Sequence, residues 1–291
     1  MLRSLYAGVS GMRSFQTKMD VIANNIANVN TTGFKSSRAM FQDMLSQTIS
    51  NAQGPANGLG GVNSQQIGLG VSVSTIDNIM TGGPMQPTNR DLDFAIEGDG
   101  FFTLSNDGTE NNLVYTRDGS FGKDHLGNLV NSSGLRIMGY AFDSLDADGN
   151  PQFLNNPGDV LIALVIPNDI GGQQLESYHI DGSGVVSAKY EGDTDMRILG
   201  KIALTRFSNP GGLEKIGGNN YRISNNSGEP VRGESGLNGF GLIRQGYLEM
   251  SNVDLANEFT EMIVTSRAYQ ANSRSITTSD EMLQELINLK R

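Results

Sequence analysis

The stretch "ANNIANVNTTG" (23–33) decides how the N-terminal part of this chain folds, because it places four asparagines within seven positions beside an apolar helical pattern. Asparagine is a mediocre helix former, since its amide competes with the backbone for hydrogen bonds. On a helical wheel at about 100° per residue, the stretch and the residues before it separate into two faces. The apolar face holds Ile22, Ile26 and Val29, and the amide face holds Asn24, Asn25 and Asn28.

The amide face has two interpretations. In the first, the asparagines mark a helix end that frays into a turn before Gly33. In the second, which we favour, they form a packing surface, because amide groups held between helices make directional hydrogen bonds that fix the register. A pair of helices alone buries too little apolar area to be stable, so this surface implies contacts with other copies of the chain.

Apolar residues recur every seven positions at both ends of the chain, which is typical of a coiled-coil-like seam. The pattern predicts a helix over residues 2–29 and another over 252–288, the second capped by Ser251 or Asn252. The predicted subunit-packing residues are Leu5, Met12, Met19, Ile22, Asn24, Asn25, Ile26, Asn28, Leu255, Met262, Tyr269, Ile276 and Leu283. The alternative is a helical hairpin that docks on its own domain.

Formal charge favours pairing of the two ends. Residues 1–33 hold three basic side chains and one acidic one, whereas residues 250–291 hold four basic and six acidic ones. Opposite net charges favour helices that lie side by side, although each exposed pair contributes only a few tenths of a kcal/mol.

The middle of the chain consists of short alternating runs separated by turn dipeptides such as Asp118-Gly119, a pattern that indicates antiparallel hairpins. The predicted fold class is therefore a mainly β middle, an antiparallel β-domain with a small β insertion, flanked by N- and C-terminal α-helices that pair in a coiled-coil-like manner. The expected parts are a terminal helical domain (1–33 and 250–291), an extended Gly-rich connector (34–75), a β-rich domain (76–140 and 199–249) and a small outer β insertion (141–198).

Composition excludes several classes of function. A formal net charge of −10 disfavours nucleic acid and membrane surfaces as partners. No apolar run reaches the roughly 18 residues of a membrane span, so we expect no membrane insertion. The first residues lack the apolar core and cleavage site of a secretory signal, so export would proceed without a cleaved signal peptide.

The sequence predicts no catalytic, cofactor-binding or metal site. There is no cysteine, and His125 and His179 stand alone. The run "DADGN" (146–150) resembles the start of a calcium loop, but Pro151 and Pro157 stand where such a loop needs glycine and glutamate, so we interpret it as a turn. We therefore do not expect an enzyme.

Five long motifs resemble the bacterial flagellar rod and hook protein family from the first residue to the last. They are "LYAGVSGM" (5–12), "DVIANNIANVNTTGFK" (20–35), "DLDFAIEGDGFF" (91–102), "SNVDLANEFTEMIVTSRAYQANS" (251–273) and "ITTSDEMLQELINLKR" (276–291). The sequences of residues 199–231 and of "SNVDL" (251–255) resemble those of hook proteins, which favours a short-form hook protein. The length of 291 residues, however, is nearer to that of a distal rod protein.

The resemblance implies a structural subunit that self-assembles into a helical tube and transmits motor torque as a flexible joint for motility. It implies that the terminal helices form an inner tube and that the β-rich middle faces outwards. The implied partners are further copies of the chain, the distal rod and hook–filament junction proteins, the hook cap and the flagellar export apparatus, at an extracellular location in the flagellum. The alternatives are a distal rod protein and, more remotely, a secreted β-domain adhesin or enzyme.

Overall fold

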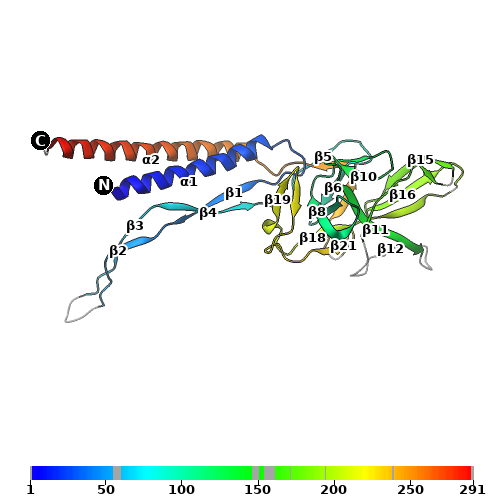
Figure 1. The fold of residues 1–291 in the computed structure, drawn as a ribbon, viewed down its shortest axis with the longest axis horizontal. Coiled ribbons are helices and arrows are strands. Elements are labelled where there is room, and N and C mark those ends of the chain that lie inside the picture. The colour runs from blue at the N-terminus through cyan, green and yellow to red at the C-terminus, as the bar shows by residue number, and fades with distance from the viewer. Residues whose placement is uncertain are drawn as a thin grey trace. The chain divides into compact units, whose positions relative to one another are not determined.

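The computed structural model describes residues 2–54, 60–145, 151–153, 161–170, 172–193, 195–237 and 239–289. Within them the chain forms two compact units: unit 1 comprises residues 1–27, 36–79 and 253–291, and unit 2 comprises residues 28–35 and 80–252. The expected fold class is confirmed, because the chain is mostly antiparallel β-structure with an N-terminal and a C-terminal helix that pack together (Figure 1). The described part of the chain contains no helix that is both long and apolar enough to cross a membrane.

Unit 1 is built on helices α1 (Leu2–Ala27) and α2 (Leu255–Leu289), which run antiparallel with the two chain ends at the same end of the pair (Figure 1). The cap predicted for the second helix is wrong. Its N-cap is Asp254, whose Oδ1 accepts hydrogen bonds from the backbone N–H groups of Ala256 at 3.0 Å and Asn257 at 3.4 Å. A carboxylate at this position also interacts favourably with the helix dipole.

A two-stranded ribbon, residues 37–54 and 60–78, completes unit 1. Strand β1 (Ser37–Asp43) pairs with β4 (Val71–Asn78), and β2 (Ser46–Ser50) pairs with β3 (Gln65–Gly68), both antiparallel. The sequence had led us to expect an extended connector over residues 34–75. Strands β2 and β3 escaped notice because they are short and rich in serine and glutamine, so they carry little of the apolar alternation that marks a half-buried strand. Strand β4 does alternate at its start, over residues 71–74, and the sequence interpretation did not use this signal.

Unit 2 holds the remaining strands, which are antiparallel throughout the described residues. The first half comprises β5 (Met85–Pro87), β6 (Phe94–Glu97), β7 (Phe101–Ser105), β8 (Leu113–Thr116), β9 (Phe121–Lys123), β10 (Leu129–Asn131), β11 (Arg136–Leu145), β12 (Pro151–Phe153), β13 (Ile162–Ala163) and β14 (Asp169–Ile170). The second half comprises β15 (Gln173–Ile180), β16 (Val185–Tyr190), β17 (Arg197–Ile202), β18 (Leu204–Arg206), β19 (Glu214–Gly217), β20 (Asn220–Arg222), β21 (Val231–Gly233), β22 (Leu242–Gln245) and β23 (Tyr247–Glu249).

The main sheet of unit 2 has the strand order β14-β15-β16-β17-β11-β7-β8-β20-β19, and β22 pairs separately with β6 and β23 with β5. Strand β7 lies between two apolar clusters, with Phe102 in one and Phe101 in the other, because successive side chains point to opposite faces. The larger cluster joins Phe102 of β7 to Val186 and Tyr190 of β16. The described part of the segment 141–198 therefore shares a core with the strands that flank it in sequence.

The "DADGN" run (146–150), which the sequence interpreted as a turn, lies outside the described residues.

Candidate assembly site

The seam between α1 and α2 is a column of small and polar residues. Both helices contribute one such residue every seven positions: Ser4, Gly11, Lys18 and Asn25 on α1, and Glu258, Thr265, Asn272 and Ser279 on α2. Ser4 Oγ lies 3.4 Å from Ser279 Oγ at one end, and Asn25 Nδ2 donates to Glu258 Oε1 over 3.0 Å at the other. These end contacts and the approach of Gly11 to Asn272 share one antiparallel register, so the two heptad columns face each other along their length.

Two glycines allow the helices to approach closely. A Cβ atom on Gly8 would lie 3.0 Å from Ile276 Cγ1, and one on Gly11 would lie 3.0 Å from Asn272 Nδ2. Both distances are tighter than ordinary van der Waals contact, so larger residues at these positions would push the helices apart. The spacing "GVSG" (8–11) was the available signal in the sequence, and the sequence interpretation did not use it.

The side-chain amide of Asn25, in the asparagine-rich stretch, hydrogen-bonds to the start of β1. Its Nδ2 donates to the carbonyl oxygen of Ser37 at 2.8 Å, and its Oδ1 accepts from the backbone N–H of Ser37 at 3.0 Å. The side chain thus presents the same donor and acceptor pair as a neighbouring strand and holds the first residue of β1. Asn25 is buried, and its partners lie in its own chain.

The remaining asparagines divide between helix and turn. Asn24 lies on an exposed part of α1, whereas Asn28 follows the last helical residue, Ala27, and accepts a hydrogen bond from Thr31 Oγ1 at 3.1 Å. Gly33 ends the turn with φ of +67°, a conformation that other residues rarely adopt. The turn at Asn28 to Gly33 agrees with the first interpretation, whereas the contacts with other copies that the second implies stay a prediction.

Most of the predicted apolar residues flank the seam, whereas Ile276 lies within it, against Gly8. Leu5, Met12, Met19 and Ile26 on α1 are half-buried, as are Met262, Ile276 and Leu283 on α2, while Ile22 is buried. Leu255 and Tyr269 are exposed. The role of these residues in packing between subunits stays a prediction, since a single chain does not test it.

Unit 1 exposes apolar side chains on two elements. Leu255, Phe259 and Ile263, here called the α2 strip, follow one another at four-residue spacing, and Phe259 and Ile263 are 51% and 63% exposed. On the ribbon, Leu45 is 82% exposed, and Ile49 and Val62 are also exposed. Exposed apolar side chains that follow one another along an element are typical of a surface that another chain covers.

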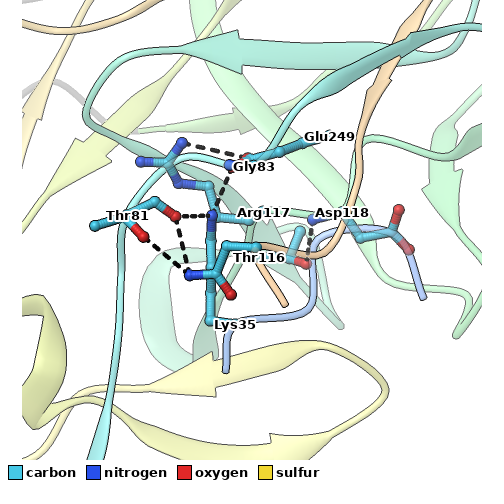
Figure 2. A network of polar contacts seen from close by, with 8 residues as sticks. Lys35, Thr81, Gly83, Thr116, Arg117, Asp118 and Glu249 are labelled. Carbon is cyan, nitrogen blue, oxygen red and sulfur yellow. Dashed lines mark hydrogen bonds and ion pairs between the residues drawn. The ribbon is translucent and has the colours of Figure 1, made fainter. Parts of the chain in front are cut away.

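A buried polar cluster lies in unit 2, where the chain enters and leaves this unit. Lys35 Nζ forms an ion pair with Glu249 Oε1 at 2.5 Å, and Arg117 Nη1 lies 3.4 Å from Glu249 Oε2 (Figure 2). Lys35 also donates to the carbonyl oxygen of Thr81 at 2.8 Å, and the backbone N–H of Gly83 donates to Glu249 Oε1 at 2.9 Å. This Glu249 cluster (Lys35, Arg117 and Glu249) therefore ties together segments that are far apart in sequence.

Burial dominates the electrostatics of the Glu249 cluster. Lys35 and Glu249 are each 1% exposed. Desolvation lowers the pKa of Lys35, against the opposing effect of the Glu249 carboxylate. Removing one member of such a group strongly lowers the stability of the fold, because it leaves a buried charge without a partner of opposite charge.

Three family models match the chain. They are described as "Flagella basal body rod protein" over residues 5–35, "Flagellar hook protein FlgE/F/G D1 domain" over residues 95–188, and "Flagellar basal body rod FlgEFG protein C-terminal" over residues 244–289. The first and last cover the elements of the α1–α2 pair, and the middle one covers strands of unit 2.

Whole-chain comparisons extend this similarity. The chain is 48% identical to the flagellar basal-body rod protein FlgG of Bacillus subtilis (strain 168) over 294 aligned positions, which cover 100% of both chains. It is 41% identical to FlgG of Borreliella burgdorferi over 294 positions, again covering 100% of both chains. It is 34% identical to the flagellar hook protein FlgE of the same organism, but that alignment spans 445 positions to cover both chains fully.

Proposed function

Because the chain belongs to the flagellar rod and hook protein family, we propose that it is a structural subunit of the distal rod, the rigid drive shaft of the flagellar basal body. The rod assignment is supported by the length of the alignments with rod proteins together with their sequence identity to this chain. Rod proteins align with this chain over 294 positions at 48% and 41% identity, whereas the hook protein needs 445 positions at 34%. The sequence favoured the hook, and the comparisons support its alternative, the rod, better.

The rod subunit acts by assembling. The α2 strip and the exposed apolar residues of the ribbon give a single chain two different uncovered surfaces. Two different surfaces that bind each other in successive copies make a heterologous contact, which grows a helical tube unless the rotation closes it. In the proposed tube the terminal segments 1–33 and 250–291 form the inner layer and the β-rich middle faces outwards.

The ribbon supports a stiff tube better than a flexible joint. The sequence interpretation gave residues 34–75 as an extended Gly-rich connector, but the described residues within 51–70 continue a hydrogen-bonded ribbon, with Gln53 paired to Val62. A two-stranded ribbon is marginally stable alone, so neighbouring subunits would have to cover it. Such cover would couple adjacent copies, as a drive shaft requires.

The proposed partners are further copies of this chain, the adjoining axial proteins of the flagellum and the flagellar export apparatus. We propose a structural role without catalysis, in line with the structural names of the relatives. Within the described residues no group of three or more potential metal-ligating side chains lies together.

Electron microscopy of basal bodies from a strain that lacks the protein tests the assignment. A distal rod subunit predicts truncated rods without hooks. Complete rods that lack only hooks would support the hook instead, and intact flagella would contradict both.

A matched pair of variants tests the assembly surface. Ile263→Asn removes one apolar side chain from the α2 strip, and Leu126→Asn makes a similar change at a residue of unit 2 that is 60% exposed. Full burial of an Ile-sized side chain contributes about 2 kcal/mol. Because Ile263 is 63% exposed in the single chain, covering that fraction contributes about 1.3 kcal/mol, so Ile263→Asn should raise the critical concentration for tube formation by about tenfold. Equal effects of the two variants would contradict a role for the α2 strip.

A further inference from the structure

The last two turns of α2 form a helix end that α1 does not cover. In the seam Ser279 lies against Ser4, so α2 continues past the start of α1 (Figure 1). Leu286 follows Ser279 by seven positions and is the next member of the seam column, but it is a leucine where the earlier members are small or polar. Met282 and Leu286 are 45% and 49% exposed. Residues 282–289, here called the α2 end, therefore present apolar surface that the described residues of α1 leave open.

A groove of about 480 Å³ lies in unit 1 between α1 and the ribbon. Tyr6 and Val9 of α1 contribute apolar lining on one side, and Leu69 and Val73 of the ribbon contribute it on the other. At about 30 Å³ of liquid volume per water molecule, the groove has room for about 16 non-hydrogen atoms, which is enough for two or three aliphatic side chains. Tyr6 is 71% exposed, so the groove is open to another chain along its α1 side.

Contacts within unit 1 hold the groove in shape. Ser10 Oγ accepts the backbone N–H of Val71 at 3.4 Å, and Ser14 Oγ donates to the carbonyl oxygen of Val71, also at 3.4 Å. The Phe15 ring packs edge-on against the Phe41 ring, with 5.6 Å between the ring centres. Strands β1 and β4 are thereby fixed against α1, and a groove that exists before its occupant binds lowers the entropic cost of binding.

Formal charges favour the α2 end as the occupant of this groove. Arg13 is the one charged side chain among the described residues that line the groove, and it is exposed. Glu285 is exposed on the α2 end, about 60° round the helix from Met282. Within the described part of the chain neither Arg13 nor Glu285 belongs to an ion pair. An acid at the edge of an apolar helix face is complementary to a base in an apolar groove.

The two charges cannot meet within one chain. Gly11 of α1 lies against Asn272 of α2. At 1.5 Å per helical residue, Asn272 and Glu285 lie about 20 Å apart along the helix axis, which exceeds the combined reach of an arginine and a glutamate side chain. A contact between Arg13 and Glu285 therefore requires a second copy.

We propose that the groove binds the α2 end of a second copy of this chain. Met282 and Leu286 pack against the apolar lining, since an amphipathic helix anchors in such a groove through residues three or four positions apart. Glu285 pairs with Arg13 at the edge of the contact. The groove and the α2 end are different surfaces, so the contact can repeat from copy to copy, as a helical polymer requires. The α2 end lies about 30 Å along the helix from Ile263, so this contact is separate from that of the α2 strip. The inference rests on the proposed assembly of the chain into a polymer.

Disulfide trapping between two full-length variants tests the contact, because the chain has no cysteine of its own. One variant carries Tyr6→Cys in the groove, and the other carries Met282→Cys on the α2 end. With a mild oxidant the mixture should give a disulfide between the two variants at about tenfold the yield of a mixture in which Leu126→Cys replaces Met282→Cys. Leu126 is an exposed residue of unit 2 and lies on neither surface. Mass spectrometry of the linked peptides identifies the pair, and equal yields in the two mixtures overturn the proposal.

Charge reversal tests the ion pair in chains that keep their apolar anchors. Arg13→Glu places a second acid opposite Glu285 and should raise the critical concentration for tube formation about tenfold, and Glu285→Arg should have the same effect. A chain with both substitutions should assemble at a critical concentration within about threefold of that of the wild type, a recovery that a misfolded variant would not produce. Arg222→Glu, at an exposed residue of unit 2 paired with Glu214, is the control and should leave the critical concentration unchanged. Failure of the double variant to recover assembly overturns the proposal.

The contact and the rod assignment can fail separately. Equal disulfide yields together with truncated rods in the strain that lacks the protein reject the contact and leave the rod assignment standing. Intact flagella in that strain reject the rod assignment, whereas selective trapping of Tyr6→Cys with Met282→Cys would still support the contact between copies.

Discussion

Replacing Asn25 with aspartate tests the hydrogen bonds that its side-chain amide donates, because aspartate has nearly the same shape. The variant Asn25→Asp keeps the size of the side chain but removes the Nδ2 donor. The lost bonds are those to the Ser37 carbonyl oxygen at 2.8 Å and to Glu258 Oε1 at 3.0 Å. The acceptor that binds the Ser37 N–H at 3.0 Å remains.

The expected cost follows from these two bonds. A neutral hydrogen bond contributes about 1 kcal/mol and one to a charged acceptor about 1.5–3 kcal/mol, so unit 1 should lose about 3 kcal/mol. The new carboxylate also faces the Glu258 carboxylate, which raises the pKa of the introduced acid. A raised pKa means that the lost stability is recovered below the unfolded value of about 4 and is fully lost once the pH has risen through the folded value.

Helix signal in circular dichroism during thermal unfolding measures the loss of stability, and hydrogen exchange at the Ser37 amide reports the local contact. The matched control is Gln16→Glu, which makes the same charge change at an exposed residue of α1. It should change stability by less than about 0.5 kcal/mol. If Asn25→Asp unfolded like the wild type at pH 7, or if its deficit did not shrink near pH 4, the assigned contacts would be refuted.

Three further outcomes are expected. Gly11→Leu should separate the helix pair and reduce stability by about 1–3 kcal/mol, because its side chain would enter the space of Asn272. Gly54→Leu is the control and should leave helix content unchanged, since a Cβ atom added at Gly54 meets nothing within 4 Å. Glu249→Gln should destabilise unit 2 by about 3–5 kcal/mol in chemical unfolding, since it leaves the buried cations Lys35 and Arg117 without their carboxylate. The control Glu214→Gln, at an exposed ion pair, should reduce stability by less than about 1 kcal/mol. Similar losses of stability in the two variants would contradict the Glu249 cluster. Burial raises the pKa of Tyr115 and Tyr221 to about 12, so absorbance at alkaline pH should show two phenols that titrate well above the ordinary value of about 10. The stability they contribute below pH 10 should disappear between about pH 10 and 12.

The sequence predicted helices and strands well where the signal is local. Heptad spacing located α1 and α2 to within a few residues, and turn dipeptides indicated the antiparallel middle, because periodicity and turn conformation depend on neighbours in the chain. Strands β2 and β3 of the ribbon were not predicted, since each is short and mainly polar, with a single isoleucine.

The candidate site was harder to predict from sequence. Two heptad columns coexist on each terminal helix, one apolar and one small or polar, and their spacing is identical. The apolar column is the usual choice for a seam. In this chain the small and polar column forms the seam instead, because Gly8 and Gly11 let the two helix backbones approach closely. Asn272 and Ile276 then fill the space that larger side chains on α1 would occupy.

The helical ends, the β-rich middle and the family resemblance could be predicted without a structure, because all of them depend on residues that are close along the chain. The folded chain alone reveals that Asn25 pairs with Ser37 and Glu258. It also reveals that Lys35, Arg117 and Glu249 form one buried cluster. Long-range pairs of this kind depend on how the backbone returns to the same place. That path is set by packing over the whole unit and leaves no periodic trace in the sequence.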